Sequence, residues 1–210
     1  MNYFGYEIDE KIINLAKQAE IELKDVFENF DNVCMQNSAK ILKAFQQHNL
    51  SLPDFNEVNG YGYYDAGRDK LEAVFAQIFG AEDALVRPQI MCGTHAIALT
   101  FFGLLKHGDT LVSLTGEPYD SLKSIVGICG DSQNSLLAHG IKYEQIELVD
   151  NDFDIPKITQ RLQQSKVKMV EIQRSRGYSQ RDSLSFAKIQ KVCTALKKAD
   201  PECIIMVDNC

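Results

Sequence analysis

The stretch Cys203-Ile-Ile-Met-Val-Asp-Asn-Cys210 decides the fold class of this 210-residue chain. Residues 203–207 form a continuous apolar run, which is the pattern of a β-strand buried on both faces. Strands of that kind belong to parallel sheets that carry helices on each face. Because ligands of such sheets bind at the carboxyl ends of the strands, Asp208 becomes a candidate site residue.

Upstream of this stretch, short apolar runs alternate with amphipathic segments. This alternation predicts an α/β fold with a mainly parallel sheet and helices on both faces. The expected strands are 84–87, 110–114, 142–147, 168–172 and 203–207. The expected helices between them are 94–106, 121–128, 156–163 and 186–199.

The first part of the chain has a helical pattern instead. Apolar residues recur at three- and four-residue steps through residues 9–48, and a further helix is expected from residue 68 to residue 79. We therefore divide the chain into an N-terminal helical segment, 1–58, and the first part of a larger α/β domain, 59–210. Since the apolar run at 203–207 needs neighbouring strands and a return helix, we expect the complete protein to continue beyond Cys210.

Composition excludes several classes of protein. The net charge is −7 without any basic cluster, which argues against a nucleic-acid partner. No apolar run approaches the about 18 residues that a membrane span needs. The six cysteines are scattered, with no spacing typical of a metal site. We expect reduced thiols, no bound metal and a cytoplasmic location, since the N-terminus lacks the pattern of a secretory signal.

Three features follow expected strands and could carry chemistry. Gly93-Thr94 begins a helix, where backbone N–H groups and the helix dipole attract phosphate; it could equally be a plain helix start capped by Thr94. Tyr119 could stack on a planar cofactor or remain an ordinary loop aromatic. Asp208 would need a cationic partner if buried, and is otherwise a helix cap or an exposed loop acid.

Several strings in the sequence resemble those of one enzyme family, the methionine gamma-lyase-like proteins. These proteins, often called aluminium resistance proteins, belong to the pyridoxal-phosphate (PLP) enzymes of cysteine and methionine metabolism, and the resemblance extends from Asp9 onward. It implies the aspartate-aminotransferase-like fold of fold type I PLP enzymes. The strings are Gly60-Tyr-Gly-Tyr-Tyr-Asp-Ala-Gly-Arg-Asp69, Phe79-Gly-Ala-Glu-Asp-Ala-Leu-Val-Arg-Pro-Gln89, Cys92-Gly-Thr-His-Ala-Ile97, Gly116-Glu-Pro-Tyr119, Arg174-Ser-Arg-Gly-Tyr178 and Val207-Asp-Asn-Cys210.

The resemblance implies cofactor-binding roles for four residues. Gly93 and Thr94 match the turn that holds the PLP phosphate, and Tyr119 matches the aromatic residue that stacks on the pyridine ring. Asp208 matches the carboxylate that keeps the ring nitrogen protonated, which makes the ring an electron sink. Cys92 departs from the family pattern, because many relatives have Ser at this position.

Four further residues match the family more loosely. Tyr63 and Arg68 fall where relatives send a Tyr and an Arg into the phosphate site of the neighbouring subunit, which implies a homo-oligomer, a dimer or a tetramer. Arg174 or Arg176 could meet the phenolic oxygen of the cofactor or a substrate carboxylate. The alternative for this pair, two arginines on a surface loop, stays open.

In relatives, the lysine that binds the cofactor as a Schiff base lies beyond the position of Asp208. No lysine of this chain has the matching context, so we expect residues 1–210 alone to be inactive. The complete protein is expected to be a PLP-dependent carbon–sulfur lyase that eliminates at the β or γ carbon of a sulfur-containing amino acid. The alternative is a non-catalytic truncated or split-gene product that acts only through a partner chain.

Overall fold

The computed structural model describes residues 2–3, 5–57, 61, 63, 65–130 and 133–209, and for residues 2–3 the backbone alone. Contacts divide the chain into two compact units, Met1–Pro88 and Gln89–Cys210. The boundary that we expected between residues 58 and 59 lies outside the described residues.

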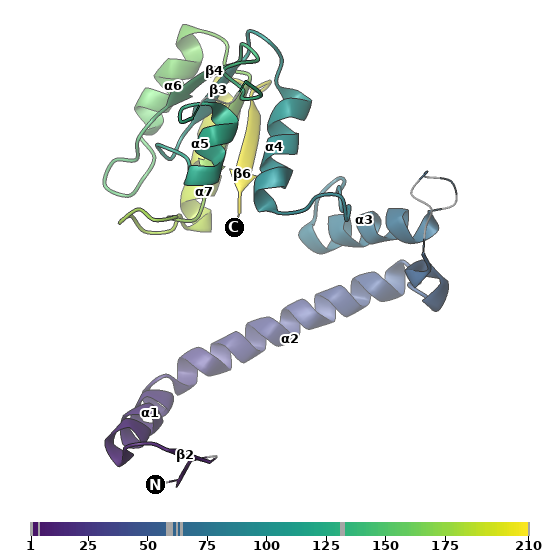
Figure 1. Ribbon diagram of the computed structural model, residues 1–210, viewed down its shortest axis with the longest axis vertical. Helices are drawn as coiled ribbons and strands as arrows, with labels where there is room; N and C mark the ends of the chain where they lie inside the picture. The colour runs from purple at the N-terminus through teal and green to yellow at the C-terminus, as the bar shows by residue number, and fades with distance from the viewer. Residues whose placement is uncertain are drawn as a thin grey trace. The chain divides into compact units, whose positions relative to one another are not determined.

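The first unit is mainly helical. It contains a short antiparallel pair, β1 (Asn2–Tyr3) and β2 (Tyr6–Glu7), followed by α1 (Glu10–Glu22), α2 (Lys24–Gln47), the 3-10 turn η1 (Leu52–Phe55) and α3 (Ala66–Phe79). Figure 1 shows α2 as one long helix. Helix α3 ends at Gly80, whose φ of 65° is a left-handed conformation that glycine adopts without steric cost.

The strand expected at residues 84–87 is wrong. The segment has no regular secondary structure, and the side chain of Glu72 on α3 binds it. The Val86 amide donates to Glu72 Oε1 at 2.9 Å, and Arg87 forms an ion pair with the same carboxylate. A helix side chain thus satisfies polar groups that a sheet partner would otherwise pair with.

The second unit is an α/β layer structure. Its elements in order are α4 (Gly93–Leu104), β3 (Thr110–Ser113), α5 (Asp120–Val126), β4 (Lys142–Gln145), α6 (Ile155–Gln164), β5 (Met169–Gln173), α7 (Phe186–Ala199) and β6 (Ile204–Asp208). The strands lie in the order β4-β3-β5-β6 and all pairs are parallel. Each expected strand from residue 110 onward is confirmed to within one or two residues.

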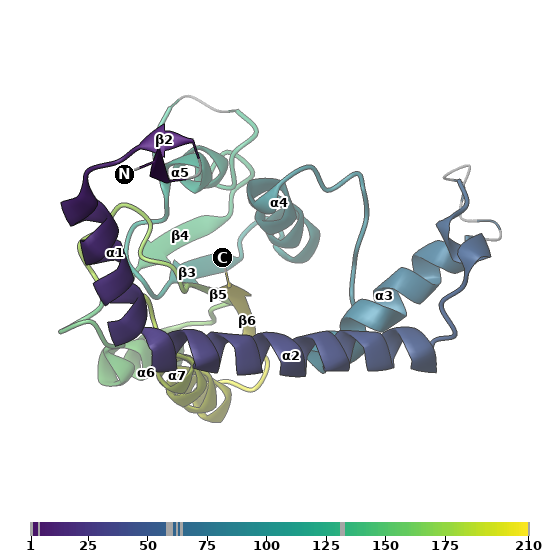
Figure 2. The same cartoon turned by 90° about the horizontal axis from the view of Figure 1, so that it is seen from below.

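Helices cover both faces of the sheet, as the alternation predicted (Figure 2). On one face, Val112 and Val170 pack with side chains of α6 and α7. On the other, Leu111 and Met169 pack with side chains of α4 and α5. The two-residue period of a strand therefore sends alternate side chains of β3 and β5 into two separate apolar layers.

Strand β6 is less buried than the apolar run predicted. Cys203 is buried, but the residues from Ile204 to Asp208 are half-buried or exposed. Within the described residues β6 pairs only with β5 and forms an edge of the sheet. The burial on both faces that the apolar run predicted is therefore not found for residues 204–208.

No helix in the described part of the chain has the length and apolar character to cross a membrane.

The packing of α7 gives a test of the fold. Leu196 is fully buried between α7 and the sheet, so Leu196→Ala should lower the free energy of unfolding by about 2–5 kcal/mol. The exposed Lys191 on the same helix is the matched control, and Lys191→Ala should change it by less than about 0.5 kcal/mol. Urea unfolding followed by circular dichroism measures both, and equal effects would contradict the packing.

Candidate functional site

Three hydroxyl groups meet at the start of α4. Thr94 Oγ1 lies 3.2 Å from Tyr119 Oη and 2.9 Å from Ser121 Oγ. The residue before the helix, Cys92, has extended backbone, so the first amides of α4 are not used within the helix. Amides at a helix N-terminus together with neighbouring hydroxyl donors form a site that suits a phosphate or another anion.

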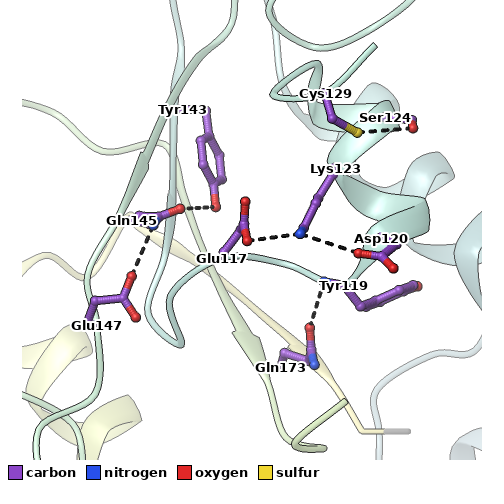
Figure 3. A network of polar contacts seen from close by, with 10 residues as sticks. All are labelled: Glu117, Tyr119, Asp120, Lys123, Ser124, Cys129, Tyr143, Gln145, Glu147 and Gln173. Atoms are coloured by element: carbon purple, nitrogen blue, oxygen red, sulfur yellow. Dashed lines mark hydrogen bonds and ion pairs between the residues drawn. The ribbon is translucent and has the colours of Figure 1, made fainter. Parts of the chain in front are cut away.

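Tyr119 links this cluster to the carboxyl end of β5. Its backbone N–H donates to Gln173 Oε1 at 3.3 Å (Figure 3). Gln173 pairs in register with Asp208 on β6. Since Ile204 and Met206 pack on the α4/α5 face, the strand period directs Asp208 to the same face. Thr94, Tyr119 and Asp208 therefore lie on the same face of the sheet, near the carboxyl ends of its strands.

The direction in which successive strands are added to the sheet reverses between β3 and β5. The chain goes from β3 to β4 on one side and then crosses back to β5 on the other, so the carboxyl ends of β3 and β5 form a switch point. A cavity of about 460 Å³ opens there, which we call the edge cavity. Its walls come from the segment after β3 (115 and 117–120), Lys123, the segment after β4 (147, 148 and 151), Gln173 and the segment after β5 (176–179 and 181).

Charged side chains of both signs line the edge cavity. Lys123 Nζ lies 2.9 Å from Glu117 Oε2 and 3.3 Å from Asp120 Oδ1 (Figure 3). The hydrogen bond with Glu117 raises the pKa of Lys123. Glu147 Oε1 accepts a 3.0 Å hydrogen bond from Gln145 Nε2. No group of three or more His, Cys, Asp or Glu within the described ranges could hold a metal ion.

The structure separates the two arginines that the sequence left as alternatives. Arg174 is not among the residues that line the edge cavity. Its guanidinium donates to the Leu184 carbonyl at 3.3 Å and to Asn209 Oδ1 at 3.0 Å. Arg176 lines the edge cavity. Arg181, which sequence reasoning did not single out, also lines it and donates to the Gln173 carbonyl at 2.9 Å.

Tyr63 and Arg68 lie in the first unit. Arg68 Nη1 is 3.3 Å from Asp65 Oδ2, and Tyr63 is 74% exposed. Their role toward a neighbouring subunit stays a prediction.

A buried carboxyl group lies on the central strand β5, two residues before its carboxyl end. Glu171 on β5 is 2% exposed and its Oε2 accepts a 2.8 Å hydrogen bond from Ser113 Oγ, while Oε1 has no partner among the described residues. Burial raises the pKa of Glu171 to about 7, and the Asp208 carboxylate adds to the shift. Burial likewise raises the pKa of the neighbouring Tyr143, with Glu171 as a further cause.

Sequence reasoning missed Ser121, Glu147, Glu171, Gln173 and Arg181. Two signals could have found some of them. Glu147 and Gln173 stand at or just after the carboxyl ends of predicted strands, where the rule for ligand sites applies. Glu171 interrupts the apolar run Met169-Val-Glu-Ile172, and a charged residue inside a central strand must be buried.

Comparisons with known proteins show which family the chain resembles. A family model described as "Methionine gamma-lyase" matches residues 12–210. A solved structure from Listeria monocytogenes, named "putative cystathionine beta-lyase involved in aluminum resistance", is 44% identical with a TM-score of 0.89 over 94% of this chain and 50% of that chain. A "carbon-sulfur lyase involved in aluminum resistance" from Clostridium novyi is 36% identical with a TM-score of 0.90, over 97% of this chain and 49% of that chain.

Two further relatives extend the comparison. The uncharacterized protein YnbB of Bacillus subtilis is 36% identical over 197 residues, which are 93% of this chain and 47% of that protein. The chain therefore spans about half the length of the relatives it matches. A PLP-dependent protein, YhfS of Escherichia coli, is 18% identical with a TM-score of 0.62 over 83% of this chain and 43% of that chain, a likeness of fold alone.

Glu171 should make stability depend on pH. Its pKa is about 7 in the folded protein against an ordinary value of 4.5, so the folded state binds the proton more tightly than the unfolded chain. This contribution is complete below pH 4.5 and is lost as the pH rises through about 7. The free energy of unfolding should fall over this range by on the order of 1–3 kcal/mol.

Glu171→Gln should remove most of that slope, because a neutral amide keeps the hydrogen bond from Ser113 without titrating. Glu202→Gln changes an exposed carboxylate and should leave the slope unchanged. Urea unfolding at several pH values between about 5 and about 8 measures this. A slope that persists in Glu171→Gln would show that another group causes it.

Proposed function

Because the chain belongs to the methionine gamma-lyase family, we propose that it forms part of a PLP-dependent carbon–sulfur lyase acting on a sulfur-containing amino acid. The observation that carries this proposal is the hydroxyl cluster at the start of α4, which lies on the same face and edge of the sheet as Asp208. Names of relatives as lyases support the reaction class.

The residues present fit PLP at three points. The α4 N-terminus with the hydroxyl groups of Thr94 and Ser121 would bind the phosphate. The ring of Tyr119 would lie against the pyridine ring. The Asp208 carboxylate would hold a proton on the ring nitrogen, because an opposite charge nearby favours the protonated form.

When bound, PLP supplies an electron sink that stabilises negative charge at the α carbon of an amino acid. The residues of this chain would bind PLP and hold it in one orientation. The α4 N-terminus, Tyr119 and Asp208 belong to three separate elements, and together they would fix the position and the plane of the pyridine ring. A fixed ring would keep the reacting atom of the substrate at a constant distance from the catalytic base. We place the lysine that binds PLP outside residues 1–210, in accordance with the relatives' greater length.

We also propose that the lyase is a cytoplasmic homo-oligomer, a dimer or a tetramer. The five described cysteines are free thiols, which fits a reducing compartment. Exposed apolar residues follow α2 at helical spacing, and a large apolar surface of this kind is typical of protein interfaces. They include Val26, Phe27, Phe30, Val33, Ile41 and Phe45, each at least 39% exposed.

The oligomer has a direct test. Phe30 is 60% exposed, so Phe30→Glu should not unfold the helix but should weaken association at least about tenfold, since a charge would have to enter an apolar contact. Sedimentation velocity across a concentration series measures the dissociation constant. The control is Lys40→Glu, at an exposed polar position of the same helix. A monomeric wild-type protein would contradict the proposal.

The enzyme proposal is tested at Asp208 in the full-length protein reconstituted with PLP. Asp208→Asn should reduce turnover of S-methyl-L-cysteine by on the order of 100-fold or more, the scale of one lost electrostatic contact at a reacting group. It should also shift the visible absorbance of the bound cofactor, because the charge beside the ring nitrogen is gone.

Glu202→Gln is the matched control, since Glu202 is exposed and precedes the amino end of the same strand. It should keep wild-type turnover and spectrum. Wild-type turnover and absorbance in Asp208→Asn would show that this carboxylate does not contact the cofactor. A wild-type protein that binds no PLP would overturn the proposed function itself.

A further inference from the structure

We propose that Gln173 is a positioning residue for the cofactor: its side-chain amide holds the backbone of Tyr119, and thereby the aromatic ring that would lie against the pyridine ring. The inference rests on the proposed function and adds to it a residue that acts through another side chain. Gln173 is the last residue of β5 and is 6% exposed. It pairs in register with Asp208, so it lies next to two of the candidate cofactor contacts.

The backbone N–H of Tyr119 needs a partner from outside its own helix. Tyr119 is the N-cap residue of α5 and has extended backbone, and its carbonyl accepts from the amides of Leu122 and Lys123. Its own amide lies before the helix, where no turn of α5 can pair with it. Gln173 Oε1 accepts from this amide at 3.3 Å (Figure 3), so a side chain of the sheet supplies the contact.

Contacts at opposite ends of Tyr119 fix its ring. The hydroxyl group lies 3.2 Å from Thr94 Oγ1 at the start of α4, and the backbone is held by Gln173 at the end of β5. A side chain that is held at both ends keeps one orientation. The orientation of an aromatic ring sets how closely it packs on a planar cofactor. Loss of the contact with Gln173 would release the backbone end while the hydroxyl contact remains.

The amide of Gln173 is itself fixed in one orientation. Its Nε2 donates to the Ser175 carbonyl at 3.1 Å, which leaves Oε1 to act as the acceptor. The next turn comes close to the same nitrogen, because a Cβ added at Gly177 would lie 3.2 Å from Nε2. The backbone N–H of Gln173 donates to Thr115 Oγ1 at 3.2 Å, and its carbonyl accepts from Arg181 Nη2 at 2.9 Å. A residue held at its backbone and at its side chain can keep another residue in a fixed place.

The test measures the binding of PLP and of inorganic phosphate to the full-length protein freed of cofactor. Gln173→Met replaces the amide by an unbranched side chain of similar length. It should raise the dissociation constant of PLP at least about tenfold, the scale of one lost hydrogen bond. It should also change the visible circular dichroism of bound PLP, because this signal depends on how the ring is oriented against its surroundings. Inorganic phosphate should keep a dissociation constant within about twofold of the wild-type value, since other residues form its site at the start of α4.

A double-mutant cycle shows whether Gln173 acts through Tyr119. In a Tyr119→Ala background the ring is already absent, so the further change Gln173→Met should alter the dissociation constant of PLP by less than about twofold. Gln163→Met is the matched control at an exposed position of α6, and it should bind both ligands as the wild type does. Gln173→Asn keeps an amide that is one methylene shorter, and it should weaken PLP binding in the same way if Gln173→Met does not fold.

The outcomes that would overturn the inference differ from those that would overturn the proposed function. Wild-type PLP affinity and dichroism in the Gln173 variants would show that the amide does not position the cofactor. Equal losses for PLP and phosphate would assign Gln173 to the stability of the fold alone. A loss of full size in the Tyr119→Ala background would show that Gln173 acts by another route. These three results leave the proposed function standing, whereas a wild-type protein that binds no PLP would overturn the function and the inference together.

Discussion

Parallel pairing of β5 with β3 on one side and β6 on the other positions every candidate site residue of the second unit's sheet. The register places Val170 beside Val112 and Ile205, so the carboxyl ends of three strands finish at one edge. Gln173, Thr115 and Asp208 stand at or just after those ends. A slip of one residue would turn each of these side chains to the opposite face, which the two apolar layers prevent.

The central strand β5 contains buried polar side chains. β5 is buried along its whole length, yet two of its five residues are polar. Gln173 uses both ends of its amide, since Oε1 accepts from Tyr119 and Nε2 donates to the Ser175 carbonyl. Glu171 has one hydrogen bond and one unpaired oxygen, so burial favours its neutral form.

The hydroxyl cluster and the edge cavity differ in the chemical groups that they contain. The cluster of Thr94, Tyr119 and Ser121 collects donors at the start of a helix, which suits an anion. The edge cavity is lined by charged side chains of both signs. Tyr119 belongs to both, so the two sites lie next to each other.

The sequence by itself determined the α/β class and the strands from residue 110 onward, because apolar period and strand–helix alternation are local patterns. It also indicated the family, through the resemblance of short strings such as Arg174-Ser-Arg-Gly-Tyr178. It also singled out Thr94, Tyr119 and Asp208 as candidates, because each stands after a recognisable strand or at a helix start, and their cofactor roles stay predictions. It misjudged residues 84–87, where an apolar run is bound by a helix side chain, and the burial of β6, which depends on how many neighbours that strand has. Only the tertiary structure decided which arginine lines the edge cavity, and that Ser121 and Gln173 join the site. Those contacts unite residues 27 to 58 positions apart, and side-chain directions across such separations depend on strand register rather than on local pattern.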